Sequence, residues 1–420
     1  MSYLIKLSFK NLFRHKLRTS VSIAAIVVSI IVVVFARGLI TGMINSTYAD
    51  YIQYNSGHIR IIDNKYEQKE RLLSLNYPVD GFRGKGIDNM MAELNEINNV
   101  KMVVPRLKFG GAASTGDELV EMMGWGVKAK KEVEFTRLDD KLVEGRMVKE
   151  GKMEVIMGSQ LLQDLNKNVG DKVTIMYNTS FNSFKGATFK IVGRIESNLK
   201  LVNEKLFYLP LDRAQYLLYM DNMATELLLV AEDRDLTAQI VSPVNQLLAE
   251  NNTANKYAVI PWYATGGLIP WLELAKNIYN IVYVFIIGLA SFVVINTMIM
   301  IVNERTQEIG MMSALGLDKR SILKLFVWEG AIMGGIGSII GAILGGIITE
   351  VFSITGLNFS EGFEGVGEEI LMSPIIYPQN SLYNIIFAFV LGVIIVTIAS
   401  IIPARKAANL EPTDALRNVN

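Results

Sequence analysis

Apolar residues gather in four long stretches of this chain, and charged residues close off most of them. The stretches run from Thr19 to Ala36, from Asn277 to Asn303, from Gly330 to Thr349 and from about Ile385 to Ala404. A helix needs about 20 mainly apolar residues to cross the hydrocarbon core of a bilayer. The pattern therefore predicts four membrane-spanning helices.

The first stretch has one competing interpretation, a cleaved signal peptide, because basic residues precede an apolar run. The run is longer than the usual apolar part of a signal peptide, and Arg37 follows it directly. We therefore expect it to remain in the protein as the first membrane helix.

Between Gly57 and Ala258 the apolar runs are short and are broken by Gly, Asn and Asp. This pattern predicts a large α+β domain between the first and second membrane helices. The predicted strands are His58–Ile62, Met102–Leu107, Val155–Met157, Asp171–Tyr177, Thr188–Ile195 and Glu226–Val230. The predicted helices are Asp88–Ile97, Ser159–Leu165, Asp212–Tyr219 and Leu236–Glu250.

Two of these strands are joined by the polar segment Asn178–Ala187, which predicts a long hairpin loop. The segment also carries Phe181 and Phe184. Aromatic side chains at an exposed tip indicate a contact surface for a partner. The alternative is that both rings fold back onto the sheet.

The orientation in the membrane follows from the short basic segments. Residues 1–18 contain Lys and Arg but no acidic residue, and residues 304–324 and 405–420 carry further basic side chains. Short basic segments beside membrane helices stay in the cytoplasm. Both termini and the loop 304–324 are therefore predicted to be cytoplasmic, and the large domain extracytoplasmic.

The first 18 residues also show a helical pattern. Apolar residues Ile5, Phe9, Leu12 and Phe13 share one face, and Lys6, Lys10, Arg14 and Arg18 recur on another. This arrangement predicts an amphipathic helix at the membrane surface. A basic topology signal without a defined helix is the alternative.

These observations divide the chain into nine segments. They are 1–18, a cytoplasmic amphipathic helix; 19–43, the first membrane helix; 44–270, the extracytoplasmic α+β domain; 271–303, the second membrane helix; 304–324, a cytoplasmic loop; 325–350, the third membrane helix; 351–381, an extracytoplasmic loop; 382–404, the fourth membrane helix; and 405–420, a cytoplasmic tail.

Composition and charge narrow the possible functions. The chain has 41 basic and 41 acidic residues, so no overall positive charge favours nucleic acid. It has no cysteine, which excludes disulfides, thiolate metal sites and cysteine nucleophiles, and its two histidines, His15 and His58, do not form a metal cluster. The acidic residues Asp139, Asp140 and Glu144 are typical of a solvated surface. We therefore expect no catalytic site and no metal.

The third apolar stretch contains Gly330, Gly334, Gly337, Gly341 and Gly345, most of which lie four residues apart. Small residues at this spacing let helix backbones approach closely in lipid. The glycines would pack either against a second copy of the chain or against other helices of the same chain.

The loop 304–324 is helix-prone and amphipathic, which a simple connection does not require. Gly316 is placed to end a short helix, and Asp318 is placed to cap the next one. The apolar residues Ile309, Met312 and Leu315, with Ala314 beside them, predict a face that docks into a groove of a cytosolic partner.

This loop resembles the E-R-x-x-E-I-G-x-x-x-A-L-G signature of the MacB/FtsX-type ABC transporter permeases. The matching residues are Glu304, Arg305, Glu308, Ile309, Gly310, Ala314, Leu315 and Gly316. The segment 403–417 is similar to the family's P-A-R-x-A-A-x-x-x-P-x-x-A-L-R ending, and 10–19 to its N-R-x-R-T opening. Each of the three matches lies beside a membrane helix predicted independently.

The resemblance implies a machine in which two permease chains, identical or related, pair above an ABC ATPase dimer. It implies that the loop acts as a coupling helix on the ATPase. The residues assigned to coupling are Glu304, Arg305, Glu308, Ile309, Gly310, Met312, Ala314, Leu315 and Gly316. The chain lacks the G-x-x-x-x-G-K-[ST] loop, so ATP and Mg²⁺ are expected in a separate ATPase subunit, and this chain is expected to be neither an enzyme nor a cofactor carrier.

Within the family, the chain length and the size of the domain look most like the lipoprotein-releasing (LolC/LolE) permeases of the bacterial inner membrane. Their resemblance implies lipoproteins as cargo, a periplasmic carrier, contact with membrane lipids, and a cavity between the first two membrane helices. The cavity residues expected here are Ile40, Met43, Ile44, Ile278, Ile281, Val282 and Phe285. The carrier contact would be Phe181 and Phe184.

One departure weakens that assignment. The carrier-recruiting permeases have a long hook with proline in the hairpin, whereas Asn178–Ala187 is short and has no proline. Two other functions therefore stay open: a MacB-like exporter of peptides or small amphiphiles, and a membrane scaffold that regulates extracytoplasmic hydrolases.

Overall fold

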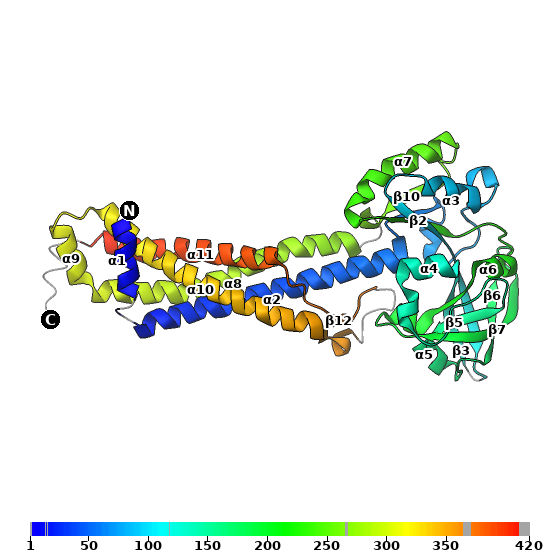
Figure 1. The fold of residues 1–420 in the computed structure, drawn as a ribbon, viewed down its shortest axis with the longest axis horizontal. Coiled ribbons are helices and arrows are strands. Elements are labelled where there is room, and N and C mark those ends of the chain that lie inside the picture. Colours follow the sequence, from blue (N-terminus) through cyan, green and yellow to red (C-terminus); the bar gives the residue numbers. More distant parts are fainter. Residues whose placement is uncertain are drawn as a thin grey trace. The chain divides into compact units, whose positions relative to one another are not determined.

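The computed structural model describes residues 2–410, apart from residues 13, 15, 117, 265–267 and 364–370 (Figure 1). The chain forms two compact units. The helical unit comprises Met1–Asn45, Trp271–Asn358 and Ile376–Asn420. The sheet domain comprises Ser46–Pro270 and Phe359–Ile375. The predicted loop 351–381 is therefore divided, because its middle part belongs to the sheet domain.

Four long helices make up most of the helical unit. They are α2 (Lys16–Tyr51), α8 (Leu268–Glu304), α10 (Lys319–Thr355) and α11 (Leu382–Ala408). All four are long and apolar enough to cross a membrane, as the sequence predicts. Two of them, α2 and α10, extend well beyond the predicted spans 19–43 and 325–350, because helix-forming residues continue each helix past its apolar part. Side chains from all four meet in one apolar core.

The N-terminal segment forms the helix α1 (Ser2–Leu12). Leu12 is buried, and the Ser8 hydroxyl donates a hydrogen bond to the carbonyl oxygen of Leu325 on α10 at 3.0 Å. Phe9 is half exposed, and Phe13 lies outside the described residues. The helix therefore packs on α10 through a narrower face than the sequence pattern suggests.

The glycines of α10 pack within the chain. A β-carbon at Gly337, Gly341 or Gly345 would lie 2.7–2.9 Å from side chains of α2, and one at Gly330 would lie 2.3 Å from Ser400 on α11. These distances are too short for any side chain, so the glycines permit direct contact between helix backbones. The structure thus favours packing inside one chain over packing against a second copy.

The sheet domain is built on a ten-stranded mixed sheet. Its order is β10-β1-β9-β2-β3-β8-β5-β7-β4, and β6 pairs with β2 and β7. The strands are β1 (Ile59–Asp63), β2 (Val100–Ser114), β3 (Leu119–Val127), β4 (Leu142–Gly145), β5 (Glu154–Gly158), β6 (Lys172–Asn178), β7 (Phe184–Ile195), β8 (Leu206–Pro210), β9 (Glu226–Ala231) and β10 (Tyr257–Pro261). Two short strands, β11 (Leu357–Asn358) and β12 (Ile375–Ile376), lie outside this sheet.

Five helices accompany this sheet. They are α3 (Ile87–Asn95), α4 (Ala129–Thr136), α5 (Ser159–Asp164), α6 (Leu211–Leu218) and α7 (Thr237–Glu250). All six predicted strands and all four predicted helices are present, which confirms the α+β class. The helix α4 and four strands of this sheet, β3, β4, β8 and β10, were not predicted from the sequence, nor were the two short strands β11 and β12.

Two glycines explain why the strand β3 was not predicted. Gly124 and Gly126 interrupt its apolar alternation, yet both are required by their neighbours. A β-carbon at Gly124 would lie 2.4 Å from the Phe109 ring, and one at Gly126 would lie 2.4 Å from Ala214. The missing side chains make room for larger ones in the core.

The hairpin between β6 and β7 is tighter than predicted. Asn178 pairs with Phe184, so the connection contains only residues 179–183, and Phe184–Ala187 belong to β7. The predicted loop Asn178–Ala187 is therefore wrong in length, because its C-terminal half pairs with β6. Phe181 and Phe184 are 73% and 68% exposed, and the Phe181 ring lies 5.8 Å from the Tyr219 ring.

Candidate functional site at the turn between α8 and α10

The turn between the second and third membrane helices contains the short helix α9 (Thr306–Ala314). Gly316 adopts a left-handed backbone with φ of 95° and donates its N–H to the carbonyl of Ser313, while the Leu317 N–H bonds to the carbonyl of Met312. This is the Schellman ending of a helix. The Asp318 carboxylate accepts a hydrogen bond from the Ser321 N–H and caps α10. Both helix ends lie where the sequence predicts them.

Arg305 lies at the start of α9 and is only 7% exposed. Its Nη2 donates to Asn11 Oδ1 on α1 at 2.9 Å, and its Nη1 lies 3.5 Å from Glu329 Oε1 on α10. Asn11 Nδ2 in turn donates to Glu329 Oε1 at 2.9 Å. Arg305 thus ties the turn to α1 and α10 through one small polar network.

The two acidic residues of the signature also pair within the chain. Glu308 Oε2 lies 3.0 Å from Arg14 Nη1 and 3.5 Å from Arg305 Nε, and Glu304 forms an ion pair with Arg18. Pairs this exposed each contribute little stability. Together they hold the N-terminal segment against the turn, a role that the sequence alone did not reveal.

The apolar residues of α9 divide into two faces. Ile309 is 1% exposed, and Met312 packs with it against the core of the helical unit. Leu315 is 90% exposed and Met311 51%, and Ala314 is exposed beside them. The docking face expected from the sequence is therefore redrawn: Ile309 and Met312 serve internal packing, and Met311, Ala314 and Leu315 are the surface left for a partner. Gly310 is buried with Ile309.

A groove runs beside this surface. Its walls come from α1, the α9 turn and α10, and they include Leu7, Asn11, Glu308, Met311, Leu315 and Phe326. The groove therefore combines apolar side chains with the ion-paired signature residues, and it lies entirely within the helical unit.

The residues expected to line a cargo cavity are only partly brought together. Ile40 and Ile44 on α2 line a small pocket with residues of α8. The α8 residues Ile278, Ile281, Val282 and Phe285 are not part of that pocket but form an exposed apolar strip, with Ile281 70% and Phe285 65% exposed. Met43 is half-buried.

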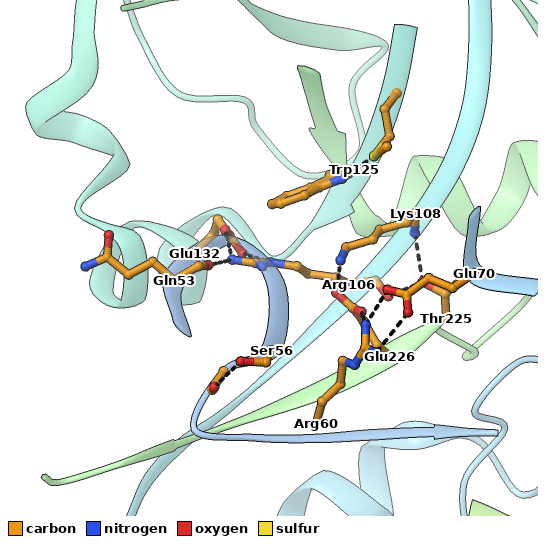
Figure 2. Close-up of polar contacts among 12 residues, drawn as sticks. Gln53, Ser56, Arg60, Glu70, Arg106, Lys108, Trp125, Glu132, Thr225 and Glu226 are labelled. Carbon is orange, nitrogen blue, oxygen red and sulfur yellow. Dashed lines mark hydrogen bonds and ion pairs between the residues drawn. The ribbon is translucent and has the colours of Figure 1, made fainter. Parts of the chain in front are cut away.

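The sheet domain holds a second polar cluster that the sequence did not predict. Figure 2 shows Arg106 on β2 facing Glu132 on α4, with Arg106 Nη2 donating to Glu132 Oε1 at 2.7 Å and Nε donating to Oε2 at 3.2 Å. Both side chains are 0% exposed. The guanidinium also lies 4.5 Å from the Trp125 ring. Because the strand arginine and the helix glutamate are 26 residues apart, the local sequence pattern does not predict that they pair.

Next to this pair, Glu226 lies between two cations (Figure 2). Its Oε1 is 2.8 Å from Lys108 Nζ and its Oε2 is 3.6 Å from Arg60 Nη1, while Arg60 Nη2 donates to Glu70 Oε2 at 2.9 Å. Burial lowers the pKa of Lys108, although Glu226 opposes that shift. Arg60, Glu70 and Lys108 also line a pocket of the sheet domain.

The described residues contain no group of three His, Asp or Glu side chains placed to hold a metal ion. Asp139, Asp140 and Glu144 are exposed, and Glu144 lies 3.7 Å from Arg194. These residues have the surroundings of surface charges.

Two family models cover most of the chain. The MacB-like periplasmic core domain matches residues 19–247, which include most of α2 and most of the sheet domain. The FtsX-like permease C-terminal region matches residues 280–412, which include α9 and the last two membrane helices.

Three relatives illustrate the similarity. The lipoprotein-releasing system transmembrane protein LolE of Haemophilus influenzae is 25% identical over 78% of this chain and 80% of its own length. LolC of Xylella fastidiosa is 22% identical over 70% of this chain and 72% of its own. An uncharacterised ABC transporter permease of Methanocaldococcus jannaschii is 22% identical over 99% of this chain and 97% of its own. With four membrane helices, a large domain between the first two and both family models in order, this chain belongs to the MacB/FtsX family of ABC transporter permeases.

Proposed function

We propose that this permease converts ATP hydrolysis in a separate ABC ATPase dimer into movement of its sheet domain on the other side of the membrane. The ATPase docks on α9, and ATP and Mg²⁺ are bound by that partner. A second permease, identical or related, completes the assembly. The observation that carries the proposal is the exposed apolar face of α9, made by Met311, Ala314 and Leu315, on a turn anchored by Arg305.

The chemistry of this turn supports a docking role. A leucine and a methionine that are exposed on a short capped helix are removed from water only when a partner covers them. Their removal from water favours binding. Arg305, at the start of α9, donates to Asn11 on α1 and lies beside Glu329 on α10. Glu308 of α9 pairs with Arg14 between α1 and α2. A push on α9 therefore reaches α1 and α10 directly.

The orientation that this function needs agrees with the distribution of basic residues. Residues 1–18, the α9 turn and the tail are basic and would be cytoplasmic, and the sheet domain would be extracytoplasmic. The membrane that we propose for this chain is the inner membrane of a bacterium, which borders the cytoplasm.

For cargo, we propose a lipoprotein that is extracted from the inner membrane and released to a periplasmic carrier. The lipoprotein-releasing relatives support this choice, as does the exposed apolar strip of α8. Phe181 and Phe184, at the tight hairpin, are the surface offered to the carrier.

Docking on α9 is tested with the variant Ala314→Arg, reconstituted in vesicles with the ATPase that co-purifies with the chain. We expect loss of ATP-driven transport by about tenfold or more, because an unpaired charge buried in an interface is costly. Ile354→Arg is the matched control, since Ile354 is an exposed apolar residue at the other end of α10. Normal transport by Ala314→Arg would contradict the docking role.

The orientation is tested with single cysteines, since the chain has none of its own. An impermeant thiol reagent added to intact cells should label Phe181→Cys, and should label Gln307→Cys only after the membrane is opened. Labelling of Gln307→Cys in intact cells would overturn the proposal.

The cargo is tested by mass spectrometry of molecules that co-purify with the assembled transporter. An acylated polypeptide is the expected result. A small amphiphile would instead indicate an exporter, and a bound soluble hydrolase would indicate a regulatory scaffold.

A further inference from the structure

Arg37 lies on α2 directly after the apolar stretch Thr19 to Ala36. At 1.5 Å per residue, it is about 28 Å along the helix from Arg18, close to the thickness of a hydrocarbon core, roughly 30 Å. Lys276 lies just before the apolar stretch of α8. Arg37 and Lys276 therefore belong to the same membrane surface, the one opposite to Arg18.

The Arg37 guanidinium is held in place by two other helices. Its Nε donates to Asn384 Oδ1 on α11 at 2.9 Å, and its Nη1 donates to Asn280 Oδ1 on α8 at 2.9 Å. Its central carbon lies 3.8 Å from the centre of the Phe387 ring. A guanidinium fixed this firmly is prepared for a ligand, because little side-chain freedom remains to be lost.

Arg37 differs from Arg18 in its charge partners. Among the residues that the structure describes, no acidic side chain pairs with it, whereas Arg18 at the opposite surface pairs with Glu304. An arginine has five N–H donors, and the two described hydrogen bonds use two of them. Arg37 is only partly buried, so the remaining donors are within reach of a bound anion.

A small pocket brings the second cation to the same place. Arg37, Lys276 and Asn280 line it together with the aromatic residues Tyr279 and Tyr283. Tyrosines are typical of the depth at which lipid headgroups lie. Below this level, Ile281 and Phe285 of α8 are exposed and apolar. The surface thus offers two cations at headgroup depth above an apolar strip.

We propose that Arg37 and Lys276 bind the phosphate group of a phospholipid, whose acyl chains lie along Ile281 and Phe285. Arginine binds phosphate oxygens through parallel N–H donors, and a nearby lysine adds a second charge. The proposal rests on the proposed function only in placing this surface in the outer leaflet, from which cargo would be drawn.

The test uses the purified full-length chain in detergent and native mass spectrometry. Phosphatidylglycerol, phosphatidylcholine and diacylglycerol with the same acyl chains are added at equal concentrations. We expect both phospholipids to bind about tenfold or more tightly than diacylglycerol, because only they offer an anionic acceptor. Arg37→Gln should remove this preference, and Lys276→Gln should reduce it about threefold. Arg405→Gln, the same charge change at the other end of the bundle, should keep it.

Several results would overturn the proposal. One is equal binding of diacylglycerol and the phospholipids by the unaltered chain. Another is an unchanged preference in Arg37→Gln. If Arg37→Gln fails to fold because the contacts to α8 and α11 are lost, Lys276→Gln decides, since Lys276 is exposed. Inorganic phosphate is added as a competitor in a further arm, and its binding as tightly as the phospholipids would assign the site to free phosphate instead. No nucleotide or ATPase is needed, so failure of ATPase docking would leave this result unaffected.

Discussion

The sheet domain and the helical unit fill their interiors in different ways. The sheet domain buries complete ion pairs, with Arg106 and Glu132 both 0% exposed. The helical unit instead packs backbone against side chain, with Gly337, Gly341 and Gly345 of α10 against α2. Its described ion pairs lie at one end, around α9, and only one of them, Arg305 with Glu329, is buried, whereas Arg14 and Glu308 are 56% and 45% exposed.

These two kinds of interior packing differ in how easily they can rearrange. A buried, bidentate ion pair is directional, and separating its partners leaves a charge without water. Glycine contacts between helices rest on van der Waals packing, which has no single required geometry. We therefore expect the sheet domain to move as one rigid body, and the helices to be the part that changes its packing during transport.

The largest effect on stability is expected at the buried ion pair of Arg106 and Glu132. Glu132→Gln removes the counter-charge that is hydrogen-bonded to the buried Arg106, so we expect a loss of about 3–5 kcal/mol in the stability of the sheet domain. Hydrogen exchange of the β2 amides in the full-length chain measures this loss. The control is Glu134→Gln, because Glu134 is exposed and lies 3.8 Å from Lys101. An equal effect of both variants would show that the buried pair does not lock the domain.

Acid should weaken the sheet domain through His58, which lies beside β1. His58 Nδ1 accepts a hydrogen bond from the Ala231 N–H at 3.1 Å, and burial, with Arg234 nearby, lowers its pKa to about 4. Between pH 6.5 and 4 the unfolded chain binds a proton that the folded chain does not bind. Stability is therefore complete above pH 6.5 and falls as the pH falls toward 4, with a loss of about 2 kcal/mol at pH 5.

This acid effect is measured as the difference between the unaltered chain and His58→Gln, by urea unfolding at pH 7 and pH 5. The difference isolates the contribution of His58 from those of all other titratable groups in the chain. Equal pH dependence of the two chains would rule out His58 as the acid-sensitive group.

The glycine contacts give a smaller effect. Gly341→Ala places a methyl group 2.7 Å from Ile30 Cβ, so we expect a loss of about 1–2 kcal/mol by overpacking. Gly335→Ala meets nothing within 4 Å and should stabilise α10 slightly, by up to about 1 kcal/mol. Thermal unfolding in detergent compares the two. Loss of stability in both would mean that close contact between α10 and α2 is not the cause.

The smallest effect is expected at the exposed pair of Arg14 and Glu308. A double-mutant cycle with Arg14→Gln and Glu308→Gln should give a coupling energy of about 0.5 kcal/mol, as for other surface pairs. A coupling energy above about 2 kcal/mol would mean that this exposed pair is as strong as a buried ion pair. The two units would then not differ in the strength of their ion pairs.

The sequence was sufficient wherever one physical signal dominated. Long apolar stretches identified the four membrane helices, and the backbone freedom of Gly316 and the capping carboxylate of Asp318 gave both ends of the α9 turn. The signal was also strong enough to place six strands of the sheet. In each case a local property of the chain decided the structure.

Other features depend on neighbours that are distant in sequence. Ile309 and Leu315 are equally apolar, and only the packing of α9 on the bundle decides that one is buried and the other exposed. Arg106 would be expected at a surface, because its partner on α4 is not visible in the local pattern. The spacing of the glycines in α10 predicted close helix packing, but it did not predict that α2 is the helix they contact.

Leu315 also bears on how cells handle unassembled copies of this protein. Leu315 is 90% exposed and lies beside the exposed Met311, so the two form an apolar spot of the kind that chaperones and proteases recognise. Copies made in excess of their ATPase would keep that spot uncovered. We therefore expect the abundance of this chain to follow the supply of its partner, so that quality control sets the ratio of the two subunits.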